Sequence, residues 1–123
     1  MFEIKKDDLS IHATRGDIVF FSVTAEDDGV PYKFKSGDIV RMTVVKKKDY
    51  SSVVMEKDFG VVAETETVDV FLSSEDTKIG KAISKPTDYW YEVVLNPDTL
   101  PQTIIGHDMA GAKVFKLYPE GGD

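Results

Sequence analysis

The chain has 123 residues, of which 15 are basic and 22 acidic, giving a formal net charge of −7, and it contains no cysteine. This length suits a single domain covering residues 1–123, with a core that needs no disulfide or metal. The absence of cysteine excludes thiol catalysis and cysteine-ligated zinc. Residues 64–123 hold 11 acidic and only 5 basic side chains. Such a surface repels phosphate, so we expect no nucleic-acid partner.

No stretch of about 18 apolar residues occurs, and no basic segment followed by an apolar one opens the chain. We therefore expect a protein that has no membrane partner and no export signal.

Apolar residues recur with a period of two in short runs separated by turn residues, which is typical of half-buried strands. The first segments, 2–6 and 9–14, are predicted to form an edge strand broken at Asp7–Asp8. An Asp-Gly pair at 28–29 predicts a turn. The remaining predicted strands cover residues 17–26, 37–48, 52–59, 66–72, 88–95 and 112–118.

Alternation within these strands predicts which side chains enter the core. We expect Tyr89 or Tyr91 to bond a nearby backbone group through its hydroxyl as well. The predicted inner residues are Val19, Phe21, Val23, Ala25, Val40, Met42, Val44, Tyr89, Tyr91, Val93, Leu95 and Phe115.

Only residues 73–80 carry helix signals, with Ser73 as an N-cap, acidic residues in the first turn and Gly80 as a stop. The pattern favours an all-β, immunoglobulin-like antiparallel β-sandwich of about seven or eight strands with this one short helical turn. A barrel of about five or six strands is the alternative. The distinct inner and outer face of each strand favours the sandwich.

A His107–Asp108 pair lies between Gly106 and Gly111, flanked by β-prone runs at 103–105 and 113–117. We interpret it as the loop of a hairpin, because adjacent side chains of an extended chain point apart and no Gly-x-Ser-x-Gly motif is present. The two histidines and scattered carboxylates match no metal-ligand spacing. We expect no catalytic residue, no metal, no cofactor and no enzyme activity.

The Arg-Gly-Asp triplet at 15–17 is interpreted as a turn before a strand rather than an adhesion motif.

Several large apolar side chains fall on the predicted outer faces: Phe20, Phe71, Trp90 and Val114. Together they indicate an interaction surface. In an immunoglobulin-like strand order Phe20 and Phe71 belong to neighbouring strands of one sheet and Trp90 lies on the other sheet, so we expect two different contact surfaces. Contact between protein subunits is the favoured use, and stacking of a sugar on Trp90 is the alternative.

The order of segments resembles the small immunoglobulin-like domain of phage tail and baseplate proteins. The matching pieces are "TRGDIVFFSVTAEDDGVPYKFKSGDIVRMTVVKK", "VDVFLSSEDTKIG", "YWYEVVL" and "TIIGHDMAGAKVFKLYPE", which cover most of residues 14–119. The pattern is similar to the N-terminal domain of the baseplate upper protein in prophages of Gram-positive bacteria.

The resemblance implies a virion protein that is made in the bacterial cytoplasm and packs against itself or other tail proteins. A host-surface glycan is the alternative partner. In baseplate upper proteins a longer chain follows this domain, whereas this sequence stops just after it. We therefore expect a small stand-alone virion component rather than an adaptor for a receptor-binding protein.

Overall fold

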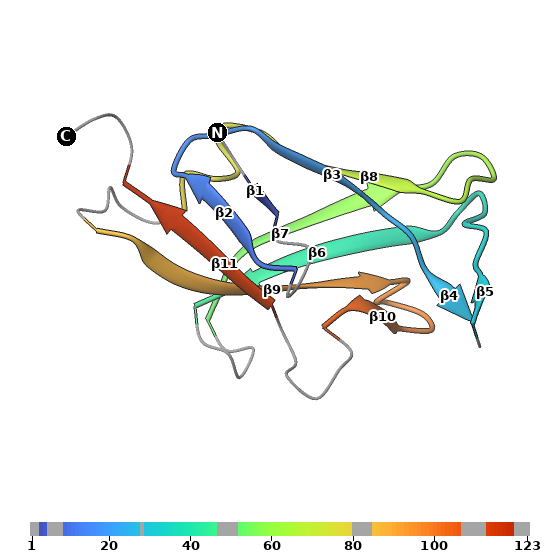
Figure 1. The fold of residues 1–123 in the computed structure, drawn as a ribbon. Helices are drawn as coiled ribbons and strands as arrows, with labels where there is room; N and C mark the ends of the chain where they lie inside the picture. The colour runs from blue at the N-terminus through green and yellow to red at the C-terminus, as the bar shows by residue number, and fades with distance from the viewer. Residues whose placement is uncertain are drawn as a thin grey trace.

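The computed structural model describes residues 3–4, 9–27, 29–46, 52–79, 85–106 and 113–119, and this part of the chain is all-β, as predicted (Figure 1). Three strands of two residues are β1 (Glu3–Ile4), β4 (Glu26–Asp27) and β5 (Val30–Pro31). The longer strands are β2 (Ile11–Thr14), β3 (Val19–Val23), β6 (Ile39–Val45), β7 (Val53–Gly60), β8 (Val68–Leu72), β9 (Thr87–Leu95), β10 (Gln102–Ile105) and β11 (Lys113–Tyr118).

The strands form two layers, in a sandwich-like arrangement. The large sheet has the order β1-β2-β11-β9-β6-β7, with β10 also paired to β9. The second layer is the pair β3-β8, which lies along one side of the large sheet in Figure 1. Strands β4 and β5 form a separate small hairpin around the predicted Asp-Gly turn, where Gly29 has a φ of 80°.

Strand β9 organises the large sheet, because it is paired along both of its edges. On one edge β6 pairs with it from Val40↔Leu95 to Val45↔Trp90. The other edge is shared between β10, which is paired with residues 93–95, and β11, which is paired with residues 87–91. Both β10 and β11 run antiparallel to β9, so they point in the same direction, one after the other.

This arrangement corrects the predicted hairpin at residues 103–117. Two arms of a hairpin must run antiparallel and pair with each other, whereas β10 and β11 are successive segments beside a single partner strand. The hairpin is instead formed by β9 and β10. His107 and Asp108 lie outside the described residues.

Residues 73–79 contain the one short turn that was predicted, with the Thr77 N–H bonded to the Ser73 carbonyl at 3.3 Å. The Ser73 hydroxyl accepts the Asp76 N–H at 3.2 Å, as expected of an N-cap. The turn does not continue as a helix, because a single turn gains too few backbone hydrogen bonds.

Two further expectations need correction. The sandwich is not wholly antiparallel, because β2 and β11 are parallel. Strand β2 is also no edge strand, since it lies between β1 and β11.

The core lies between the two layers and follows the predicted alternation. Strand β9 shows it best, because Tyr89, Tyr91, Val93 and Leu95 are buried while the residues between them are not. The predicted residues of β3, β6 and β11 also face inward, with Phe21 and Ala25 partly buried against the core. The hydroxyl of Tyr91 donates a hydrogen bond to the Leu9 carbonyl. The expected tyrosine–backbone bond therefore exists, but it ties β9 to the N-terminal segment.

Strand β7 forms one edge of the large sheet, and an inward-pointing charge lies in its middle. Lys57 pairs with Met42 in register, which places it on the core side between Met55 and Phe59. Its ammonium group bonds Asp76 at 2.6 Å. A charge facing inward on an edge strand disfavours pairing with another sheet.

We expect Phe115→Ala to lower the free energy of unfolding by about 3–5 kcal/mol, because it removes a fully buried ring that packs edge-to-face on Tyr91. Phe20→Ala is the matched control, since Phe20 is 60% exposed and its loss should cost about 1 kcal/mol or less. Urea unfolding followed by circular dichroism measures both. Equal losses would show that the inner face of β11 is wrongly assigned.

Candidate functional site

The predicted interface residues form two separate pairs. Phe20 and Phe71 are directly opposite each other in the β3–β8 pair. Val114 and Trp90 are directly opposite each other in the β11–β9 pair. The first pair lies on the outer face of the small layer and the second on the outer face of the large sheet. All four residues therefore lie outward as predicted, and Phe20–Phe71 and Trp90 lie on different sheets, as the expected strand order also predicted.

The Phe20–Phe71 pair is the more exposed of the two. Phe20 is 60% and Phe71 46% exposed, and Ile18, two residues before Phe20 on the same face, is 53% exposed. Ser22 and Asp69, opposite each other in the same register, border this apolar strip with a hydrogen bond of 2.6 Å. We call the exposed surface formed by Ile18, Phe20 and Phe71 the aromatic strip, after its two phenylalanines.

The Phe71 ring lies close to the ion pair of Lys57 and Asp76. The Lys57 ammonium lies 5.6 Å from the Phe71 ring centroid and bonds Asp76. Burial alone would raise the pKa of Asp76, but hydrogen bonds from Lys57 and Ser73 outweigh it and hold that pKa below its usual value. The ion pair therefore stays formed at neutral pH and holds a cation against this ring.

The Trp90 pair is less exposed. Trp90 is half-buried between Val114 on β11 and Val45, which is buried, on β6. The next outward residue of β9 is Glu92, whose pKa is raised by burial. The Trp90 side chain thus lies on the outer face of the large sheet, with a valine opposite it on each neighbouring strand.

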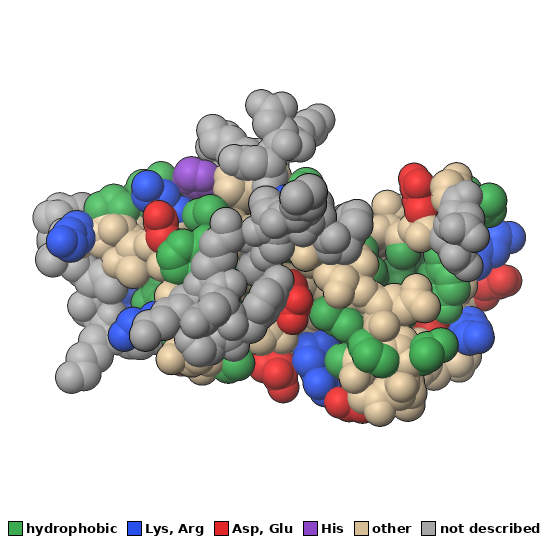
Figure 2. Space-filling view, turned by 90° about the horizontal axis from the view of Figure 1, so that it is seen from below, with side chains coloured by type: hydrophobic (Ala, Val, Ile, Leu, Met, Phe, Trp, Pro, Cys, Tyr) green, Lys and Arg blue, Asp and Glu red, His purple; other side chains and the backbone are tan. Residues whose placement is uncertain are grey.

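A charge cluster lies farther along the same face. Arg41 makes paired hydrogen bonds to Asp58 at 2.6 and 3.0 Å and to Asp98 at 3.2 and 3.1 Å. The hydrogen bonds that Arg41 donates to Asp58 and then to Asp98 raise the pKa of Arg41, and the bond to Asp58 lowers the pKa of that carboxylate. This cluster ties the β9–β10 turn to β6 and β7. Figure 2 shows acidic, basic and hydrophobic side chains interspersed on the face seen from below.

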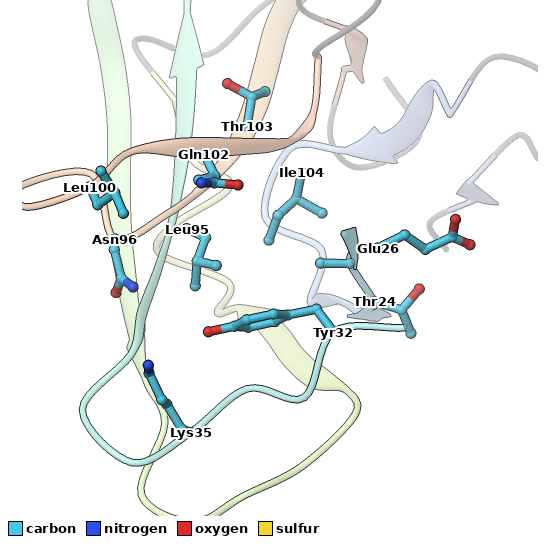
Figure 3. A pocket seen from close by; sticks show the side chains of 11 residues that line it. Thr24, Glu26, Tyr32, Lys35, Leu95, Asn96, Leu100, Gln102, Thr103 and Ile104 are labelled. Atoms are coloured by element: carbon cyan, nitrogen blue, oxygen red, sulfur yellow. The ribbon is translucent and has the colours of Figure 1, made fainter. Parts of the chain in front are cut away.

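A pocket of about 540 Å³ opens at the end of the sandwich where the β4–β5 hairpin approaches the β9–β10 turn (Figures 1 and 3). Leu95 and Ile104 point toward the ring of Tyr32, while the carboxylate of Glu26 points away from it (Figure 3). The lining residues are Thr24, Ala25, Glu26, Tyr32, Lys35, Leu95, Asn96, Leu100, Gln102, Thr103 and Ile104.

The buried carboxylate of Asp38 holds this end of the sandwich together. It accepts hydrogen bonds from the Tyr32 hydroxyl at 2.8 Å, the Lys35 N–H at 3.0 Å and the Asn96 side-chain amide at 3.1 Å. Asn96 also accepts a bond from the Ile39 N–H at 2.8 Å. Burial alone would raise the pKa of Asp38, but these bonds outweigh it and hold the pKa below its usual value. The network fixes the Tyr32 side chain relative to the β9–β10 turn.

Sequence reasoning missed this pocket. Tyr32 and Lys35 come from a turn segment, and Gln102 follows 67 residues after Lys35 in the chain. Only the pairing of β10 with β9 brings these segments together. The one local signal is the Asn-Pro-Asp turn at 96–98, where Asn96 has a φ of 50°.

The motifs considered for chemistry have structural roles where the structure describes them. In the Arg-Gly-Asp triplet, the Asp17 carboxylate accepts the Thr14 N–H at 3.0 Å, and the buried Thr77 hydroxyl bonds the Asp17 carbonyl. His12 hydrogen bonds Ser10 and Tyr118 through its two ring nitrogens. Among the described residues no group of three or more His, Asp or Glu could hold a metal ion. Nor does any helix there have the length and apolar character to span a membrane.

Comparison of the chain with protein-family models, with curated proteins and with solved structures gives no match.

We expect Asp38→Asn to lower the free energy of unfolding by about 1–3 kcal/mol at neutral pH, because an amide cannot accept all three hydrogen bonds. The folded-state pKa of Asp38 is lowered, so its stabilisation is present above the unfolded pKa of about 3.9 and is lost as pH falls through the folded value. The difference from wild type should therefore shrink below about pH 4.

Denaturant unfolding at several pH values measures this difference. Asp69→Asn is the control, since Asp69 is exposed and bonds the Ser22 hydroxyl. A difference between wild type and Asp38→Asn that stays constant down to about pH 2 would contradict the role of the ionised carboxylate.

Proposed function

We propose that the protein is a non-enzymatic structural component of a phage-derived tail or baseplate, located in the virion, which acts by packing against neighbouring proteins. The observation that carries the packing proposal is the aromatic strip. Two phenylalanines from adjacent strands lie side by side and outward in a regular sheet. Exposed apolar surface of this kind is typical of interfaces, where aromatic side chains often supply most of the binding energy.

The phage context is supported by the strand order together with the sequence resemblance. In variable-type immunoglobulin-like sandwiches, one sheet contains the order G-F-C-C′ and the other places B beside E. Here β11-β9-β6-β7 form one such row, and β3-β8 form the other pair. This order favours the immunoglobulin-like assignment on which the resemblance to baseplate domains depends.

Binding of a host-surface glycan at Trp90 is the second candidate. The observation that favours it is a half-buried indole on a flat sheet face. Its cross-strand neighbours, Val45 and Val114, offer no hydrogen bonds to sugar hydroxyls. Packing against a protein therefore suits Trp90 better, and Trp90–Val114 is proposed as a second contact surface.

We expect Phe20→Asp to weaken self-association, or binding to a neighbouring tail protein, by about 2 kcal/mol or more, because it puts a charge in the centre of the aromatic strip. Val30→Asp is the matched control, since Val30 is 63% exposed and lies in the separate β4–β5 hairpin. Sedimentation velocity at several concentrations measures association. A wild-type chain that stays monomeric and binds no tail protein would overturn the proposal.

We expect the fluorescence of Trp90, the one tryptophan in the chain, to be unchanged on titration with glycans. An indole that contacts a sugar changes its environment, whereas one reserved for protein contact does not. Saturable quenching by a glycan, together with loss of calorimetrically measured binding of that glycan in Trp90→Ala, would favour the second candidate instead.

A further inference from the structure

We propose that the pocket between Tyr32 and the β9–β10 hairpin binds a neutral pyranose sugar. This site is separate from the aromatic strip and from Trp90, and the proposal does not depend on the assembly function. Its volume of about 540 Å³ lies within the range of small-molecule sites. A single sugar ring fits such a volume.

The apolar part of the site matches one face of a sugar ring. The Tyr32 ring forms one wall, and Leu95 and Ile104 point toward it from the strands opposite (Figure 3). The hydroxyl of Tyr32 is bonded to Asp38 at 2.8 Å, and the ring packs edge-on against buried Phe34 at 5.3 Å between centroids. The ring is therefore held in place before a ligand arrives, which lowers the entropic cost of binding.

The polar part of the site matches sugar hydroxyls. Lys35 and Gln102 border the pocket and are exposed, and among the described residues neither the Lys35 ammonium nor the Gln102 side-chain amide has a hydrogen-bond or ion-pair partner. Lys35 offers donors only, while the Gln102 amide offers both donors and an acceptor. Neighbouring hydroxyls of a pyranose, each a donor and an acceptor, can use both groups.

The charges favour a neutral ligand. The carboxylate of Asp38 interacts electrostatically with Lys35 and compensates its charge. Glu26 adds a negative charge to the rim, and the whole chain has a net charge of −7. For an anionic sugar, repulsion by these negative charges would therefore exceed the attraction by Lys35.

The test is titration of the ¹⁵N-labelled protein with methyl α-D-glucopyranoside, methyl β-D-galactopyranoside and N-acetylglucosamine, followed by amide chemical shifts. For a ligand of this size we expect a Kd of about millimolar order. The shifts should concentrate in residues 24–35 and 95–104. Perturbation near Trp90 instead, or none with any of the three sugars, would overturn the proposal.

Two neighbouring variants provide a matched comparison. Gln102→Ala should weaken binding at least several-fold, whereas Thr99→Ala should leave it unchanged, because Thr99 is exposed in the turn before β10 and does not line the pocket. Equal effects of the two would contradict the site. Glucuronic acid, the anionic counterpart of glucose, should bind more weakly than the glucoside, and the reverse order would overturn the neutral assignment.

The assembly proposal is tested separately. Phe20→Asp should keep the sugar-induced shifts, and Gln102→Ala should keep self-association. Failure of one proposal therefore leaves the other measurable.

Discussion

The structure depends on the pairing of β9 along both of its edges. Because β6 lies on one edge and β10 and β11 share the other, the alternation of β9 sets the faces of the whole large sheet. Tyr91 and Val93 enter the core by the same alternation that turns Trp90 and Glu92 outward. A slip of one residue in this register would exchange the two sets and expose the core.

The same pairing connects the fold to both proposed surfaces. The turn after β9 is fixed by Asn96 and Asp98, which bond Asp38 and Arg41 on opposite sides of the sheet. The bond to Asp38 places the β9–β10 hairpin against Tyr32 and so forms the pocket. The core that β9 builds supports β3 and β8, whose outer face carries the aromatic strip.

Much of this fold follows from local sequence, because inner and outer residues alternate with a period of two. Phe20 and Phe71 were placed outward on that basis, as was Trp90. Alternation cannot show which strands are neighbours. The expected immunoglobulin-like strand order supplied one pairing, the neighbouring strands of Phe20 and Phe71, which is confirmed. It was not predicted that Phe20 lies directly opposite Phe71, or that β2 runs parallel to β11. These facts depend on long-range pairing, which no local pattern encodes.

The missed features share that cause. Residues 103–117 have the local pattern of a hairpin, two β-prone runs around a glycine-flanked loop, yet both runs pair with β9. The pocket joins segments around residues 32 and 102 that have no local relationship. The capping signals at residues 73–77 are local, by contrast, and Ser73 and Asp76 do bond each other. Local signals thus predicted the strands and this turn, and the expected strand order predicted the β3–β8 neighbours, but the partners of β2 and β10 were not predicted.

The central claim is that the aromatic strip is a protein interface. Hydrogen exchange of the wild-type chain at low and high protein concentration tests it directly, because amides beside an interface gain protection on association. If the strip is the interface, protection in residues 18–23 and 68–72 should depend on concentration. Protection in the core of β9 should not, because that strand is already protected by its own pairing. Protection that is independent of concentration in β3 and β8, while the chain sediments as an oligomer, would place the interface elsewhere and contradict the account.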